Sequence, residues 1–222
     1  MTTHLTFRWT RSRLALAAIW FAAAPMALAH VSGDATGGFG SGFQHPWSGL
    51  DHIAAMVAVG LWGAQLGAPA IWLLPVAFPL VMSVGGFLGL IGVPLPGTEI
   101  GIGASALLLG LAVAAQFRPK HLAWAAGLVG IFGLFHGHAH GTELPPGENG
   151  LFYSLGFVIA TGILHGCGLA IGEIHRWARG AKVLRTLGAV IALAGVYFLV
   201  QAVRPESTTE PAAATNRRAP QP

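Results

Sequence analysis

Six apolar stretches of about 20 residues each dominate this chain, and a helix of that length crosses the roughly 30 Å of hydrocarbon in a bilayer. Charged residues make up only 9% of the 222 residues and hydrophobic residues 54%, so a water-facing surface could not be covered with charge. The sequence therefore predicts an all-α fold, a polytopic membrane helix bundle with six transmembrane helices. The predicted spans are residues 48–66, 71–93, 98–117, 121–140, 150–172 and 184–203.

Other architectures and partners are excluded on simple grounds. No stretch alternates between apolar and polar residues with period two, so a strand barrel is excluded. The 12 Lys and Arg residues form no basic face, so we expect a lipid bilayer and no nucleic acid as the partner. A single cysteine excludes an internal disulfide and a cysteine-cluster metal site.

The N-terminal residues 1–29 have the pattern of a signal peptide. Basic residues precede an apolar run of about 11 residues, which ends in a small-x-small cleavage site, Ala27-Leu28-Ala29. An uncleaved first helix is the alternative, but the run is short for a span. The mature transmembrane domain would then cover residues 30–203, beginning with a Gly-rich exposed segment at 31–44, and residues 204–222 are predicted to be a disordered tail.

Lysine and arginine predict the orientation, because they accumulate in cytoplasmic loops. The connections between spans three and four and between spans five and six carry Lys and Arg. The connections near 95–99 and 141–150 carry acidic residues and neither Lys nor Arg. We therefore expect a multi-pass protein of the bacterial inner membrane with both mature termini in the periplasm. The basic residues of the cytoplasmic connections are Arg118, Lys120, Arg176, Arg179, Lys182 and Arg185.

Ionisable residues within membrane helices are costly and usually functional, and here the topology gathers them at the outer face. Pro46 suits a helix start, which places His45 at the mouth of the first span and Asp51 and His52 about two turns deeper. Imidazole and carboxylate groups together suit a borderline divalent ion such as Ni(II), Co(II) or Zn(II), and carboxylates also orient histidines. The predicted metal residues are His45, Asp51, His52, Glu99, His136, His140 and Glu143, together with His165 deeper in the bundle.

The histidine-bearing fourth span supports this grouping. His140 and Glu143 each project within about 40° of His136 on a helix, whereas His138 points to the opposite face and is expected to contact lipid or lipid headgroups. Glycines at 133, 137 and 141, and around His165, favour close helix packing.

The remaining histidines are interpreted one by one. His165, in the middle of the fifth span, is either an inner metal ligand, a proton relay or a hydrogen-bonding residue between helices. After cleavage, His30 offers an α-amine and an imidazole for metal chelation. We expect no functional role for Cys167, a packing residue, or for His4, His121 and His175.

Two motifs resemble the HupE/UreJ family of membrane nickel/cobalt permeases. The first is HPWSGLDH at 45–52, and the second is FHGHAHGTE at 135–143. The stretch GFVIATGILHGCGLAIG at 156–172 also resembles the fifth span of this family. The resemblance implies nickel or cobalt transport that supplies a nickel enzyme such as hydrogenase or urease. It also implies that both motifs supply required residues, namely His45, Asp51, His52, His136, His140 and Glu143.

No Walker P-loop is present, so we expect a secondary transporter with no permanently bound cofactor and no enzymatic activity. The membrane potential favours inward movement of a cation. A membrane haem-b electron-transfer protein is the alternative, which the neighbouring acids disfavour. A metallohydrolase with Glu143 as base is a third reading. The sequence allows a homo-oligomer without requiring it.

Overall fold

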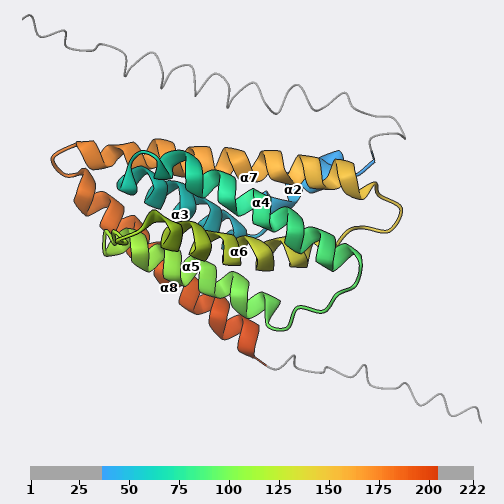
Figure 1. Ribbon diagram of the computed structural model, residues 1–222. Helices are drawn as coiled ribbons and strands as arrows, with labels where there is room; N and C mark the ends of the chain where they lie inside the picture. Colours follow the sequence, from blue (N-terminus) through green and yellow to red (C-terminus); the bar gives the residue numbers. More distant parts are fainter. Residues whose placement is uncertain (1–36, 205–222) are drawn as a thin grey trace, which may run out of the picture.

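The computed structural model describes residues 37–204, and within this range every regular element is a helix. The predicted signal peptide, His4, His30 and the residues beyond 204 lie outside the described residues. Figure 1 shows the helices running side by side as one bundle. The helices are α2 (Phe39–Ser48), α3 (Leu50–Leu66), α4 (Ala70–Leu90), α5 (Thr98–Ala114), α6 (Leu122–Thr142), α7 (Gly150–Gly172), the short 3-10 helix η1 (Glu173–Arg176) and α8 (Gly180–Val203).

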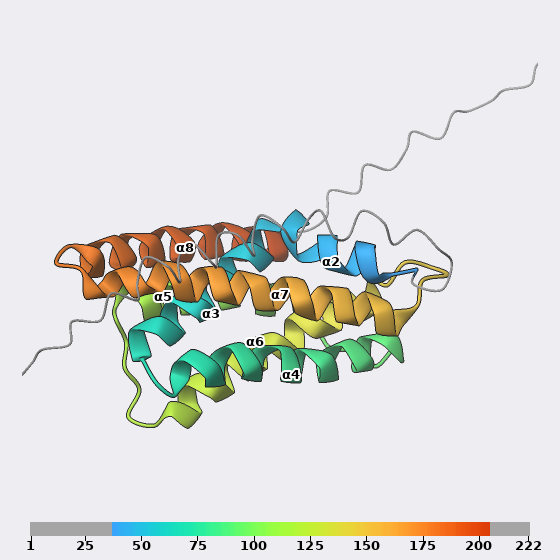
Figure 2. The same cartoon turned by 90° about the horizontal axis from the view of Figure 1, so that it is seen from above.

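The six long helices coincide with the six predicted spans. Four of them, α4, α6, α7 and α8, are long and apolar enough to cross a membrane, whereas α3 and α5 have 17 residues each. At 1.5 Å per residue the two shorter helices measure about 25 Å. The short α3 lies in the interior of the bundle (Figure 2), and most of its residues are buried. Six membrane crossings remain a prediction.

Glycines allow the backbones of paired helices to approach closely. In the α4–α6 pair, a methyl group at Gly137 would overlap the carbonyl of Met82. In the α3–α7 pair, a methyl group at Gly60 would overlap the carbonyl of His165, and one at Gly168 would overlap that of Val57. Close backbone approach of this kind is typical of membrane helices. The glycines predicted to favour close packing near the histidines do so on α6 and at Gly168 and Gly172, whereas Gly162 and Gly166 have no described neighbour within 4 Å of an added methyl group.

The first span differs from the prediction in one respect. The exposed segment expected at 31–44 is wrong from residue 39 onward, because residues 39–44 belong to the helix α2, and an extended Gly49 separates α2 from α3. Both helices pack along α7. Together they resemble one long helix that is interrupted at Gly49. Pro46 consequently lies in the last turn of α2 and does not start the span. The tight contact between Gly42 and Tyr153 explains why this Gly-rich segment is helical at all.

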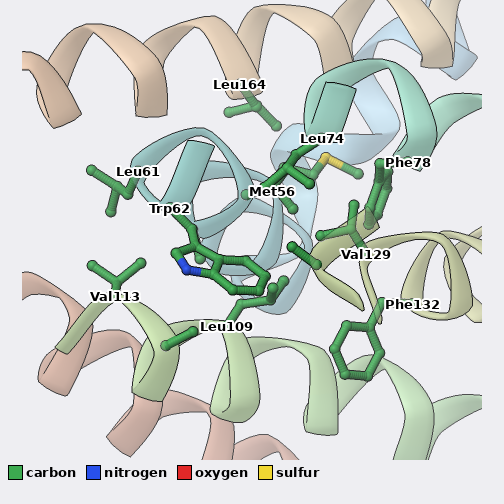
Figure 3. Close-up of a cluster of buried hydrophobic side chains, with 14 of the residues drawn as sticks. Met56, Leu61, Trp62, Leu74, Phe78, Leu109, Val113, Val129, Phe132 and Leu164 are labelled. Atoms are coloured by element: carbon green, nitrogen blue, oxygen red, sulfur yellow. The ribbon is translucent and has the colours of Figure 1, made fainter. Parts of the chain in front are cut away.

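The end of the bundle that carries the basic connections is filled with apolar side chains. Trp62 of α3 lies there beside Leu109 and Val113 of α5, and Leu74 of α4 belongs to the same buried cluster (Figure 3). The indole Nε1 of Trp62 donates a hydrogen bond to the carbonyl of Phe117 at 2.9 Å. The interior around Trp62 is therefore apolar, whereas the opposite half contains most of the buried histidines.

Candidate metal site

Four imidazole rings meet at the other end of the bundle, where α2, α3 and α6 converge. His140 of α6 lies between two of them, with ring centroids 4.5 Å from His45 and 4.7 Å from His52. His136, one turn deeper on α6, lies 5.0 Å from His52. These four residues are called the histidine cluster below. The structure thus brings together histidines that the sequence predicted to share a site.

The outer part of the histidine cluster has the geometry of a metal site. His45 Nε2 lies 3.3 Å from Glu143 Oε2, and His140 Nδ1 lies 3.9 Å from the same oxygen. Ligand atoms of these three residues all lie within 4.8 Å of one another. Two ligands bound about 2.1 Å from one ion are themselves about 3 to 3.5 Å apart. Small side-chain movements would therefore place one ion among these three residues.

Two deeper histidines have their free nitrogens oriented by hydrogen bonds. His52 Nδ1 lies 2.8 Å from Asp51 Oδ1, and His136 Nδ1 lies 2.9 Å from the carbonyl of Phe132. Since both partners are acceptors, the proton is assigned to Nδ1 in each ring. This leaves the Nε2 lone pair of both rings free for a metal ion, which is the usual arrangement of metal-binding histidines.

Burial makes these free nitrogens unusual. His136 is fully buried, and His140 and His52 are 5% and 9% exposed. Nε2 of His52, His136 and His140 has no hydrogen-bond partner among the described residues. Buried polar atoms nearly always have partners, so three unpaired nitrogens in one cluster indicate a ligand. The cluster fits a borderline divalent cation, because such ions prefer imidazole nitrogen.

Carboxylates surround the outward opening of the histidine cluster. A cavity of about 330 Å³ is lined by His45, Asp51, His52, Glu99 and Glu143, among other residues. The hydrogen bond with His45 lowers the pKa of the Glu143 carboxyl below its ordinary value. Glu143 therefore remains anionic and attracts cations to the opening. Seven of the eight residues predicted for the site thus line this cavity or belong to the cluster beneath it, and His165 lies apart from both.

His138 is correctly predicted to point away from the cluster, but its predicted lipid contact is wrong. The side chain is 6% exposed, and its Nε2 donates a hydrogen bond to the carbonyl of Val93 at 2.7 Å. Its Nδ1 lies 3.4 Å from Thr98 Oγ1. His138 therefore fastens the α4–α5 connection, which leads directly to Glu99.

The sequence reasoning missed the aromatic residues around the site. Tyr153 Oη lies 3.1 Å from His45 Nδ1, and the ring centroid of Phe157 lies 3.9 Å from that of His140. Phe78 of α4 lies 5.3 Å from His136. The spacing of four residues between Tyr153 and Phe157, continued by Thr161 and His165, was the available signal. It marks one face of α7 that looks onto the histidines.

The comparisons with known proteins confirm the family resemblance that the two motifs indicate. Residues 17–198 match the family described as HupE / UreJ protein. Protein HupE of Rhizobium leguminosarum bv. viciae is 46% identical over 176 residues, which cover 79% of this chain and 91% of that protein. No solved structure matches the chain. The family match covers well over half of the sequence, and the chain therefore belongs to the HupE/UreJ family.

Proposed function

We propose that the protein is a secondary transporter that carries nickel, and cobalt as a second cargo, inward across the bacterial inner membrane. The single observation that carries this proposal is the group of buried, unpaired imidazole nitrogens beneath an acidic opening. Membership of the HupE/UreJ family supports a membrane metal transporter. The ion is the transported substrate and not a resident cofactor. The site is open on one side, with carboxylates at the opening and imidazole nitrogens beneath it.

The route begins at the carboxylates. Asp51, Glu99 and Glu143 line the opening, and their charge compensates part of the cost of removing water from a divalent ion. The ion then passes from His45, His140 and Glu143 to His52 and His136. Stepwise transfer among incomplete ligand sets suits transport, because a complete cage would retain the ion. An inward-negative potential contributes about 2.3 kcal/mol per charge per 100 mV, or roughly 4 to 5 kcal/mol for a divalent ion.

The difference between the two ends of the bundle supports the proposed orientation. Arg118 Nη2 donates to the carbonyl of Gln65 at 2.7 Å, so this basic connection lies at the end of α3 opposite the histidine cluster. The connections with Lys and Arg are assigned to the cytoplasm, and the cluster and both mature termini to the periplasm. Imported nickel would serve maturation of an enzyme such as hydrogenase or urease.

The alternative functions fit the geometry less well. A haem with two histidine ligands requires a flat slot between two imidazoles, whereas the rings of His45, His52 and His140 lie 4.5 to 6.2 Å from one another. A hydrolase of the zinc-protease type requires a glutamate next to the first histidine of its helix. Gly137 occupies that position, and it packs tightly against Met82.

Uptake of radioactive nickel and cobalt by cells tests the proposal. Wild-type protein should raise uptake of at least one metal above that of cells lacking the protein. His136→Ala should abolish this increase at equal membrane expression. His175→Ala, whose ring lies in η1 at the basic end, is the matched control and should retain uptake. A wild-type protein that moves neither metal, or a haem Soret band in the purified protein, would contradict the proposal.

A further inference from the structure

One aromatic ring separates the histidine cluster from another buried histidine, His165 of α7. Phe78 of α4 is fully buried, and its ring centroid lies 5.3 Å from His136 and 5.2 Å from His165. It meets the two imidazoles at interplanar angles of 61° and 88°. The rings are thus arranged in the order His136, Phe78, His165.

His165 has no hydrogen bond that accounts for its burial. The side chain is 1% exposed, and neither ring nitrogen has a hydrogen-bond partner in the described part of the chain. Within residues 37–204, no hydrogen bond of normal geometry to a neighbouring helix therefore holds the ring in place. A buried imidazole without partners is costly, so its presence between α3, α4 and α7 requires another explanation.

Two oxygen atoms accompany His165. Thr161, one turn earlier on α7, is fully buried, and its Oγ1 also lacks a partner. Pro79 has no N–H group, so it leaves the carbonyl of Pro75 without its donor within α4. That carbonyl approaches the His165 ring without completing a hydrogen bond. One imidazole nitrogen and two neutral oxygens are therefore available on the far side of Phe78.

We propose that His165, Thr161 and the Pro75 carbonyl form a second, inner binding position for the transported ion, and that Phe78 is the partition between the two positions. The inference rests on the proposed function, since it concerns the same ion. The inner position contains no carboxylate, so it binds a divalent cation more weakly than the outer one. A weak inner position suits release, and passage requires the Phe78 ring to turn aside.

Transport and outer binding, measured separately, test this assignment. Nickel uptake is measured in proteoliposomes at fixed membrane potential, and equilibrium nickel binding is measured on the solubilised protein. His165→Ala should lower uptake by about tenfold or more, as expected for loss of a metal ligand. Nickel binding at the outer position should change by less than about threefold, since that position is intact. Gly166→Ala is the matched control, because a methyl group there meets open space.

A second substitution distinguishes a ligand from a structural residue. His165→Gln retains an amide that can donate to the Pro75 carbonyl, but it removes the imidazole. If His165 is a ligand, His165→Gln should lose uptake as severely as His165→Ala. If His165→Gln transports at the wild-type rate, the imidazole is not needed and the inner position is overturned.

A spectroscopic measurement tests binding directly, without relying on transport. Cys167 is the single cysteine, so Cys167→Ser gives a thiol-free background. In that background, His165→Cys places a thiol at the inner position, and thiolates bind cobalt strongly. Addition of Co(II) should give a thiolate-to-cobalt charge-transfer band that the Cys167→Ser protein lacks. Absence of this band overturns the inner position.

The outcomes separate the two proposals. Wild-type protein that neither binds nor transports nickel or cobalt would refute the proposed function, and the inner position with it. Wild-type transport that depends on His136 but not on His165 would refute the inner position alone. Loss of uptake with retained outer binding, together with the cobalt band, supports both.

Discussion

His45 Nε2 and Glu143 Oε2 lie 3.3 Å apart and connect α2 to the residue that ends α6. Their separation is close to that of two ligands on one metal ion. A bound ion would therefore take the place of the proton that His45 shares with Glu143. Metal binding at this position should release a proton, because the ligating nitrogen must be unprotonated.

Replacement of Glu143 by glutamine should weaken nickel binding while preserving shape. We expect about a tenfold to hundredfold loss of affinity, the usual cost of altering a metal ligand or its partner. Isothermal titration of the solubilised protein with nickel measures the change. Glu148→Gln is the control, since Glu148 accepts a hydrogen bond from Ser41 on α2 and does not line the cavity. Equal affinity in the two variants would remove Glu143 from the site.

Acid should inhibit uptake through the histidines and not through Glu143. Protons compete with the ion for imidazole nitrogens, whose unperturbed pKa is near 6.5, so uptake should fall steeply below about pH 6. The pKa of Glu143 is lowered below 4.5, so its carboxylate stays charged throughout that fall. Its stabilising contact with His45 is present above pH 4.5 and is lost only as the pH falls through the lowered value.

Uptake into proteoliposomes at fixed potential and subsaturating nickel measures this pH dependence. Glu143→Gln should reduce the rate throughout this pH range, because it removes a charge that attracts the ion. Constant wild-type uptake between about pH 7.5 and pH 5 would show that imidazoles do not limit capture of the ion.

Asp51→Asn should impair transport more than His138→Ala. Asp51 accepts the hydrogen bond from His52 Nδ1, and its charge offsets that of a divalent ion in a region of low dielectric. Asparagine preserves the shape but removes the charge. His138→Ala removes the hydrogen bond to Val93 and should lower the stability by about 1 kcal/mol with most uptake retained. Uptake and thermal unfolding, measured on both proteins at equal expression, check this difference. Equal loss of uptake would contradict it.

Gly137→Ala should destabilise the α4–α6 pair. An added methyl group at Gly137 would overlap the carbonyl of Met82, and overpacking of this kind costs about 1 to 3 kcal/mol. Gly127→Ala on the same helix is the matched control, because a methyl group there meets nothing within 4 Å. Thermal unfolding in detergent should therefore show a lower midpoint for Gly137→Ala alone. The same midpoint for both proteins would contradict the packing argument.

Helix positions could be predicted closely, because hydrophobicity over about 20 residues is a strong signal. The fifth span, expected at 150–172, coincides with Gly150–Gly172. The third ends earlier than expected, at Ala114, and Gln116 adopts a left-handed conformation with φ of 53°. The helix α2 could not be predicted from composition, since its glycines and Pro46 are poor helix formers and packing on α7 decides its structure. The spacing of Phe39, Phe43 and Trp47 was the overlooked signal.

The sequence allowed us to predict which side chains lie together, but not how deeply they are buried. Alternating helices place His52 and His140 at the same end, so their proximity follows from topology. The burial of His138 depends on the path of the α4–α5 connection, which no periodicity reveals. Phe78 could not be recognised either, because a phenylalanine in an apolar helix resembles any core residue until its neighbours are placed.

The apolar packing around Trp62 has a consequence for the kinetics of transport. Trp62, Leu109 and Val113 are buried side chains that fill the bundle interior near the basic end, so passage of an ion should require the helices to separate there (Figure 3). We therefore expect the protein to work as a carrier and not as an open pore. Its flux should saturate with external metal at the rate of that rearrangement, and planar bilayers containing the protein should show no unitary current steps.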